Sequence, residues 1–380
     1  MYKIGTLNKI SPKGLSHFDD RYTISDDLAQ ASGIVVRSYN MHDMEFHPEL
    51  MAIARAGAGV NNIPLERCAE SGIVVFNTPG ANANSVCELV ISSMIMAARN
   101  MWPAMVWTSQ LTGDITPQVE KGKAMFAGFE VKGKTIVILG MGAIGTLVAN
   151  RCVDLGMNVI GFDPFISVQG ALNLDNRVTL TDNVVQALKT ADIVSIHIPY
   201  MPATDSMMNQ DFFNALKEGA IVLNFSRDKL ADADALRSWL QSDKSRYYVT
   251  DFPEEDLLKN PKVMSVPHLG ASTEEAEDNC AIMAAKQLMD YIENGNITNS
   301  VNFPSINLGP LEDSNRIAVF TKNEPHPEKL ALAMFADKRI INSAGGTMGP
   351  YGYALLSTID MVTSVPKVDG AIKVRIIQDL

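Results

Sequence analysis

The feature that most constrains this chain is a glycine-rich hexapeptide near its middle, Gly140-Met141-Gly142-Ala143-Ile144-Gly145. It follows an apolar run rich in β-branched residues, 135–139, and precedes a helical stretch, 146–154. In this setting the first glycine permits a tight turn, the second lets backbone approach a pyrophosphate, and the third lets helix and strand pack closely. Amide N–H groups at the start of the helix would face the phosphates. The hexapeptide therefore predicts a dinucleotide-binding βαβ unit.

A second β-type run, 158–162, ends at Asp163. An acidic side chain at the tip of that strand accepts hydrogen bonds from ribose hydroxyls and repels a 2′-phosphate, which predicts NAD rather than NADP as the cofactor. The alternative is a glycine-rich turn in an ordinary α/β sheet. The strand before the glycines, the helix after them and the acid at the right distance favour the nucleotide site.

The composition of the 380-residue chain is that of a globular protein of two or three domains, with 46% hydrophobic and 20% charged residues. A net charge of −11 argues against nucleic acid and membrane as partners, so an anionic substrate would need a local basic pocket. The start of the chain lacks a signal-peptide pattern, and the four cysteines have neither metal-site nor disulfide spacing. We therefore expect a cytoplasmic protein without a metal ion.

Alternating β-type and helical runs predict an α/β fold with a parallel sheet. Residues 1–97 read as a first α/β domain, 98–134 as a crossover helix and an extended arm, and 133–266 as the nucleotide domain. A long helix is predicted over 271–294, and a small α+β unit over 311–380.

Polar residues follow the ends of three successive β-type runs in the nucleotide domain. They are Arg227, the acidic cluster 251–255 and His268. Because the carboxyl ends of parallel strands share one edge, where ligands bind, we expect these side chains to lie close together. An arginine can bind a carboxylate through two N–H···O bonds, and a histidine near a carbonyl can exchange protons with it. Each also has an alternative when taken alone: a surface ion pair for Arg227, a solvated loop for 251–255 and a structural role for His268.

The chain resembles the D-isomer-specific 2-hydroxyacid dehydrogenases over residues 1–305. The resemblance rests on GMGAIG (140–145), HIPYMPATDSMMN (197–209), NFSR (224–227), DFPEE (251–255), PHLGAST (267–273), VRS (36–38), ARAGAGVNNI (54–63) and NTPGANANSVCEL (77–89). It implies a Rossmann-type doubly wound parallel sheet inserted in a flavodoxin-like substrate domain. The implied bounds are 1–98 and 282–305 for the substrate domain, 99–281 for the NAD domain and 311–380 for an ACT-like domain.

The resemblance also implies roles for individual residues. His268 is the implied general acid/base, Glu255 its carboxylate partner, and Arg227 the carboxylate-binding group. Asp163 is implied to bind the ribose and Asp251 the nicotinamide amide. The remaining implied NAD-binding residues are Gly140, Gly142, Ala143, Ile144, Gly145, His197, Pro199, Thr204, Phe225, Ser226 and Gly270. The implied substrate-binding residues are Arg37, Ser38, Arg55, Ala56, Gly57 and Asn82.

Within that family the chain is most similar to the phosphoglycerate dehydrogenases. This implies NAD-dependent oxidation of 3-phospho-D-glycerate to 3-phosphohydroxypyruvate, the first step of L-serine synthesis, on a small anionic substrate. The alternatives are a glyoxylate/hydroxypyruvate reductase, a D-lactate dehydrogenase or a non-catalytic NAD-sensing protein. The arm 98–133 carries Met101, Trp102, Met105 and Trp107, and it is implied to form a homodimer or homotetramer contact. The alternative is that both tryptophans fill a core inside the chain.

Two departures from the family pattern affect these expectations. Asp228 and Lys229 stand where most relatives have glycine, and we expect Asp228 to tolerate an unusual φ there. The tail resembles an ACT domain, but the segment between Asp360 and Lys373 is too short for a second helix with its turns. The effector-site glycine of related ACT loops is absent from 323–329. We therefore expect a truncated ACT-like unit that does not bind an amino-acid effector.

Overall fold

The computed structural model describes residues 1–378, apart from the side chain at position 169. The chain divides into two compact units, Met1–Asn82 with Glu274–Leu380, and Ala83–Thr273. The expected boundaries at 98/99 and 281/282 differ from this division because each of two helices belongs, over its whole length, to one unit. Helix α3 (Ala83–Ala98) buries its apolar face in the core of the second unit, and all of α11 (Glu274–Asn294) packs within the first.

The first unit begins with a parallel sheet of five strands in the order β2-β1-β3-β4-β5. The strands are β1 (Tyr2–Leu7), β2 (Tyr22–Ser25), β3 (Gly33–Val36), β4 (Ala52–Arg55) and β5 (Val74–Phe76). Helices α1 (Pro12–Leu15) and α2 (Leu65–Glu70) connect them, and α11 packs on β3 and β4. This strand order is that of the flavodoxin-like fold, which confirms the prediction.

The second unit contains a parallel sheet of seven strands in the order β12-β11-β10-β9-β6-β7-β8. The strands are β6 (Thr135–Leu139), β7 (Asn158–Phe162), β8 (Thr179–Leu180), β9 (Ile193–Ile196), β10 (Ala220–Asn224), β11 (Ser245–Thr250) and β12 (Val263–Ser265). Strand order reverses beside β6, between β7 on one side and β9 on the other, as in a doubly wound sheet. The carboxyl edge of the sheet at that point is where such folds bind ligands.

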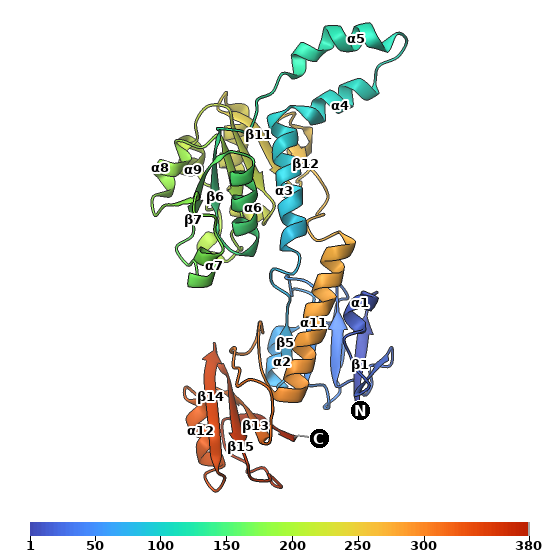
Figure 1. Cartoon of the computed structure of the whole chain (residues 1–380), viewed down its shortest axis with the longest axis vertical. Coiled ribbons are helices and arrows are strands. Elements are labelled where there is room, and N and C mark those ends of the chain that lie inside the picture. The colour runs from blue at the N-terminus through green and yellow to red at the C-terminus, as the bar shows by residue number, and fades with distance from the viewer. Residues whose placement is uncertain (379–380) are drawn as a thin grey trace. The chain divides into compact units, whose positions relative to one another are not determined.

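Helices cover both faces of this sheet, as Figure 1 shows. Alternate residues of β6 face opposite layers, so Ile136 and Ile138 join α3 and α6 (Ala143–Asp154), whereas Val137 and Leu139 face the other layer. That other layer contains α8 (Val184–Leu188), α9 (Gln210–Ala215) and α10 (Ala233–Gln241). The short helix α7 (Val168–Leu172) follows β7. Burial on both faces explains why these strands are continuous apolar runs.

An arm of two helices, α4 (Met101–Ser109) and α5 (Ile115–Gly122), followed by a 3₁₀ turn at Lys123–Phe126, extends from the second unit after α3 (Figure 1). No residue of α4 is buried. Within the described part of the chain, no single helix has the length and apolar character needed to span a membrane. Helices α3 and α4 pass that test only as a pair, which is bent by 72°.

The tail forms a four-stranded antiparallel sheet in the order β14-β15-β13-β16, with one helix. Its elements are β13 (Asn315–Lys322), α12 (Pro327–Met334), β14 (Ile340–Met348), β15 (Tyr351–Thr358) and β16 (Ala371–Gln378). One face packs on α12. Phe320 and Tyr353 on the other face join a core with Tyr291 of α11 and Phe303. The described segment between β15 and β16 contains no helix, as its length predicted.

Candidate functional site

The glycine hexapeptide forms the turn between β6 and α6. Gly140 has φ +91°, and a Cβ there would lie 2.4 Å from the carbonyl oxygen of His197. A Cβ on Gly145 would lie 1.9 Å from the carbonyl oxygen of Gly140, so only glycine fits either position. A Cβ on Gly142 would meet nothing within 4 Å. The backbone at Gly142 is therefore open to an approaching phosphate, next to the first residues of α6.

Asp163 lies directly after β7, beside this turn. Its Oδ2 accepts a hydrogen bond from the backbone N–H of Met141 at 2.8 Å, and its Oδ1 accepts one from the N–H of Phe165 at 2.8 Å. Each carboxylate oxygen can accept one further hydrogen bond, so two ribose hydroxyls have acceptors. The fixed carboxylate and the open glycine turn together fit the dinucleotide that the sequence predicts.

Further predicted NAD-binding residues follow β9 and β10 at the same edge of the sheet. Burial lowers the pKa of His197 to about 4, so its imidazole is neutral at pH 7, and its Nε2 lies 2.8 Å from Oγ of Ser195. Thr204 Oγ1 accepts a hydrogen bond from the Met201 N–H at 2.9 Å, which fixes the loop containing Pro199. Ser226 donates a hydrogen bond from Oγ to the carbonyl of Ile196 at 2.8 Å.

The loop that carries Arg227 is held by a buried asparagine that the sequence analysis did not assign. The Asn224 side chain donates to the carbonyl of Arg227 at 2.9 Å and accepts from the Ser226 N–H at 3.1 Å. The Arg227 side chain is exposed, and its guanidinium lies 5.6 Å from the ring centroid of Phe252. Two side chains that the predictions omitted, Asn224 and Phe252, thus position the arginine.

His268 contacts a buried carboxylate. Its Nδ1 lies 3.1 Å from Oδ2 of Asp251, whose side chain is only 1% exposed. The ring of His268 also contacts Phe252, with 4.7 Å between centroids. The structure therefore brings Arg227, Asp251 and His268 together around Phe252, as the positions after three strands predicted.

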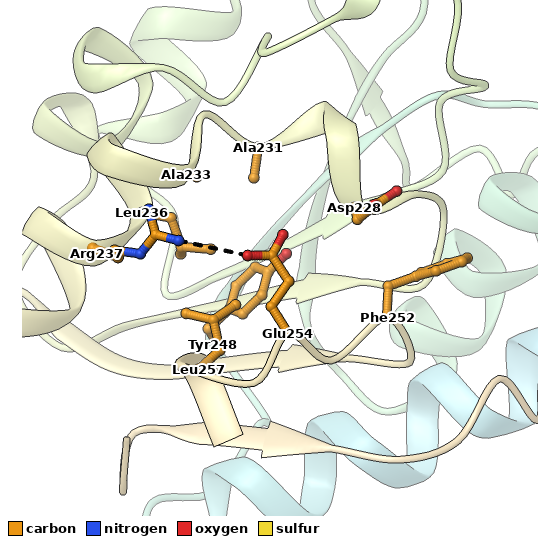
Figure 2. Close-up of a pocket in the computed structure, with 9 residues that line it drawn as sticks. All are labelled: Asp228, Ala231, Ala233, Leu236, Arg237, Tyr248, Phe252, Glu254 and Leu257. Carbon is orange, nitrogen blue, oxygen red and sulfur yellow. Dashed lines mark ion pairs between the residues drawn. The ribbon is translucent and has the colours of Figure 1, made fainter. Parts of the chain in front are cut away.

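The carboxylate partner of His268 corrects one expectation. Glu255 was expected to hold the histidine, but its side chain is 93% exposed and lies 3.9 Å from Lys259. Its neighbour Glu254 pairs with Arg237 at 3.6 Å, and Figure 2 shows its carboxylate directed at Arg237. The physical reason is that the chain turns after β11. Asp251 directly follows the strand and stays inside, whereas both glutamates lie on the outer loop that leads to the 3₁₀ turn at Leu257–Lys259.

A cavity in Figure 2 lies beside this site, lined by Asp228, Arg237, Phe252 and Glu254 among others. Its volume is about 10 Å³, which is room for one water molecule and not for a substrate. Asp228 begins a 3₁₀ turn (Asp228–Leu230) and does not have a positive φ. The expected unusual φ at Asp228 is therefore absent, because the turn continues from an extended Arg227 with φ −154°.

The predicted substrate-binding residues lie in the first unit, and five of the six cluster after β3 and β4. Arg55 donates from Nε to the carbonyl of Arg37 at 3.1 Å, and Arg37 pairs with Glu277 at 2.6 Å. Gly57 has φ +143°, and a Cβ there would lie 1.7 Å from Nη1 of Arg55. The absence of a side chain thus leaves room for the guanidinium across this turn.

The remaining predicted substrate residues are placed by backbone interactions. The N–H of Ser38 donates to Oδ1 of Asn8 at 2.9 Å, a contact that the predictions omitted. Ala56 follows β4, and Asn82 directly precedes α3. Among the described residues no group of three or more His, Cys, Asp or Glu side chains could hold a metal ion. Cys68, Cys87, Cys152 and Cys280 are buried free thiols.

Comparison with known proteins identifies the family of the second unit. Residues 91–270 match the family described as D-isomer specific 2-hydroxyacid dehydrogenase, NAD binding domain. The chain is 34% identical to D-3-phosphoglycerate dehydrogenase of Methanocaldococcus jannaschii over 299 residues, 76% of this chain and 55% of that protein. It is 30% identical to D-3-phosphoglycerate dehydrogenase of Haemophilus influenzae over 358 residues, 88% of this chain and 83% of that protein.

The chain thus spans about half the length of some of the relatives that it matches. The NAD⁺-bound 3-phosphoglycerate dehydrogenase of Entamoeba histolytica shares the fold, with a TM-score of 0.62 and 24% identity over 79% of this chain and 98% of that chain. From its matched domain and its relatives, the chain belongs to the D-isomer-specific 2-hydroxyacid dehydrogenase family.

Proposed function

We propose that the chain is an NAD-dependent oxidoreductase that converts 3-phospho-D-glycerate to 3-phosphohydroxypyruvate, the first step of L-serine synthesis. The observation that carries the proposal is the group of Arg227, Asp251 and His268 at the carboxyl edge of the sheet that bears the glycine turn. The names of the relatives that match the chain support the choice of substrate.

Bound NAD would supply the hydride acceptor. The glycine turn would bind its pyrophosphate, and Asp163 would bind a ribose. His268 would take the hydroxyl proton of the substrate at Nε2, because Nδ1 faces the Asp251 carboxylate. Arg227 would hold the substrate carboxylate through two N–H groups.

The phosphate end of the substrate is assigned to the cluster after β3 and β4 in the first unit. Arg37, Ser38, Arg55, Ala56, Gly57 and Asn82 are the proposed substrate-binding residues. Arg55 supplies positive charge in a chain whose net charge is −11, which an anionic substrate requires, whereas Arg37 already pairs with Glu277. Relatives that act on unphosphorylated hydroxy acids would not need this charge.

Initial rates test the proposal. With 3-phosphoglycerate, D-lactate and glyoxylate as substrates and both NAD and NADP cofactor pairs, we expect the highest kcat/KM for 3-phosphoglycerate with NAD. His268→Ala should lower kcat by about 10²- to 10⁴-fold with NAD affinity retained. Arg55→Gln should raise KM for 3-phosphoglycerate and leave KM for D-lactate unchanged. A preference for an unphosphorylated substrate or for NADP would contradict the proposal, and no turnover of any hydroxy acid would favour an NAD-sensing protein.

The same proposal extends to assembly and location. Met101, Trp102 and Met105 are 43%, 49% and 55% exposed, which supports the arm as a homodimer contact. The four free thiols are compatible with a cytoplasmic protein. The strand order and single helix of the tail support a truncated ACT-like unit that serves in assembly rather than in effector binding.

A further inference from the structure

A cavity lies within the first unit, where the tail meets the five-stranded sheet. Its volume is about 380 Å³, as expected of a pocket for a small molecule. One wall comes from segments 46–48 and 70–73, and the other from residues 372–373 of β16. The two segments of the first wall precede β4 and β5, so the cavity lies at the amino edge of that sheet. The proposed substrate-binding cluster follows β3 and β4 and therefore lies at the opposite edge.

The ammonium group of Lys373 is half-buried in the wall of this cavity and is incompletely paired. Its aliphatic stem lies over the backbone of Gly72, where a Cβ would come within 2.8 Å of Cδ of the lysine. Nζ lies 3.4 Å from the carbonyl oxygen of Leu50, and the described residues place no carboxylate within 4 Å of it. Burial and the nearby Arg375 lower the pKa of Lys373, whereas Glu49 raises it. A charged donor with one long hydrogen bond can accommodate an anionic acceptor.

His47 supplies a second donor to the cavity. Its Nδ1 accepts a hydrogen bond from the backbone N–H of Glu49 at 3.2 Å, so a neutral ring carries its proton on Nε2. Across residues 1–378 this Nε2 has no hydrogen-bond partner. The acid that lines the cavity, Glu70, pairs with Lys322 of β13 at 2.8 Å. The polar part of the wall therefore combines two available donors with a carboxylate that is already neutralised.

The rest of the wall is apolar. It consists of Phe46, Pro48, Ile73 and Ile372. Pockets that bind small molecules typically combine apolar walls with a few polar groups that fix the orientation of the ligand. The wall of this cavity thus fits a molecule that has an anionic head and a small apolar body.

We propose that this cavity binds a small organic anion, with its carboxylate or phosphate head on Lys373 and His47 and its apolar part on Phe46 and Ile372. Because one wall belongs to the first sheet and the other to β16, the bound molecule stabilises the junction between sheet and tail. This occupant differs from L-serine, which is a zwitterion without an apolar part. The inference does not depend on the proposed function, since binding is measured without turnover.

The test is a set of titrations of the full chain, followed by saturation-transfer NMR of the ligand. Phenyl phosphate and benzoate share an aromatic body and differ in the anionic head, whereas inorganic phosphate lacks the body and benzyl alcohol lacks the charge. Excess NADH occupies the nucleotide site. The Arg55→Gln background removes the charge of the proposed substrate-binding cluster, so neither site competes for the anion.

Three variants in this background separate the contributions to binding. Lys373→Met removes the charge from a half-buried position that tolerates an apolar chain. The matched control Lys329→Met removes a lysine charge from an exposed position on α12, which covers the other face of the tail sheet. Ser71→Phe adds a ring at an exposed residue of the cavity wall and leaves Lys373 in place.

We expect phenyl phosphate or benzoate to bind the Arg55→Gln protein with a Kd in the millimolar range, as for a ligand of about ten non-hydrogen atoms. The Kd should be unchanged in Lys329→Met. It should rise at least about tenfold in Lys373→Met, which loses a hydrogen bond to a charged group, and in Ser71→Phe, where the space is filled. Inorganic phosphate and benzyl alcohol should bind at least about tenfold more weakly than the better anion. Tighter binding of phenyl phosphate would identify a phosphate ester as the ligand class, and tighter binding of benzoate a carboxylate.

Absence of saturable binding of both anions, or an equal Kd with and without Lys373→Met, would overturn the inference. Binding to the wild type that disappears in Arg55→Gln would place the anion at the substrate-binding cluster, which overturns the inference and supports the proposed function. If Lys373→Met does not fold, an unchanged Kd in Ser71→Phe overturns the inference and a raised one supports it. If the wild type turns over none of the hydroxy acids, the proposed function fails, and the titrations still decide the inference.

Discussion

The guanidinium of Arg227 lies over one ring, that of Phe252, which also contacts the imidazole of His268. Arg227 also donates from Nη1 to the carbonyl of Ser226 at 2.6 Å, and His268 also pairs with Asp251, but the ring of Phe252 is a contact that both groups share. Phe252 thus sets the relative position of the proposed carboxylate-binding group and the proposed base. The sequence places the two residues 41 positions apart, and the fold joins them through a residue that neither motif would single out.

We predict that Phe252→Leu impairs substrate binding and the chemical step together. Loss of the cation–π contact and of the ring–ring contact removes about 1–2 kcal/mol, which corresponds to a fall in kcat/KM of about 5- to 30-fold. Phe46→Leu is the matched control, because Phe46 also lies under an arginine, Arg67, at 4.9 Å, away from the candidate site. Equal kinetics for wild type and Phe252→Leu would show that the ring is not a positioning element.

Two glycines of the same turn should respond differently to alanine. Gly145→Ala places a Cβ 1.9 Å from a carbonyl oxygen, so we expect the melting temperature to fall by about 5 °C or more. In Gly142→Ala the added Cβ has no neighbour within 4 Å, so the melting temperature of the variant should be that of the wild type. The added methyl group would, however, occupy the proposed phosphate site. Calorimetry and NAD titration of both variants separate the effects. Wild-type NAD affinity in Gly142→Ala would contradict the assigned pyrophosphate site.

The strands of the nucleotide domain were predictable because buried parallel strands leave a clear pattern. The runs 135–139 and 158–162 have the observed bounds, since each is mostly apolar and is followed by a glycine or a polar residue. Strands β2 and β8 were missed. They are short edge strands, and neither Thr179 nor Leu180 of β8 is buried. Exposed edge strands lack the apolar pattern that identifies buried ones.

The partner of His268 was not predictable from spacing alone. Three acids lie within five residues, 251–255, and only the turn after β11 decides which of them stays inside. That turn depends on the Thr250 hydroxyl and on the burial of Asp251, which are tertiary features. The positions of Arg227 and His268 were predictable because both follow strands of the same sheet.

The half-buried imidazole of His197 predicts a pH-dependent stability. Its pKa is lowered by burial to about 4, against about 6.5 in an unfolded chain, so the unfolded state binds a proton between these values and the folded state does not. Stability should therefore fall as the pH drops from 7 towards 4, by up to about 3 kcal/mol. Urea unfolding at pH 7.5 and 5.0 should show a smaller loss in His197→Gln than in wild type or the exposed control His326→Gln. Equal losses in all three proteins would contradict the assignment.

The exposed face of α4 predicts self-association. Trp102→Glu with Met105→Glu should raise the dissociation constant of a dimer at least 100-fold, because two charges would enter an apolar contact. Trp107 is a weaker target, since it packs on Phe126 within the arm at 5.3 Å. Val185→Glu adds a charge at another exposed apolar position and serves as the control. Sedimentation velocity at micromolar concentration gives the mass. A wild-type monomer would reject the contact.

The tail predicts an enzyme without feedback control by L-serine. The loop before α12 leads into Glu328, whose Oε1 accepts a hydrogen bond from the Ser343 hydroxyl at 2.6 Å. A Cβ at Gly345 would lie 2.8 Å from Cβ of Glu328, so the start of α12 and β14 are already in close contact. An effector bound here would have to displace that contact, and it must also favour one state of the enzyme over another to change the rate. We expect L-serine at millimolar concentration to leave the initial rate unchanged, with glycine as the control amino acid. Saturable inhibition by L-serine that Glu328→Gln weakens would show that the tail is a regulatory site despite the missing glycine.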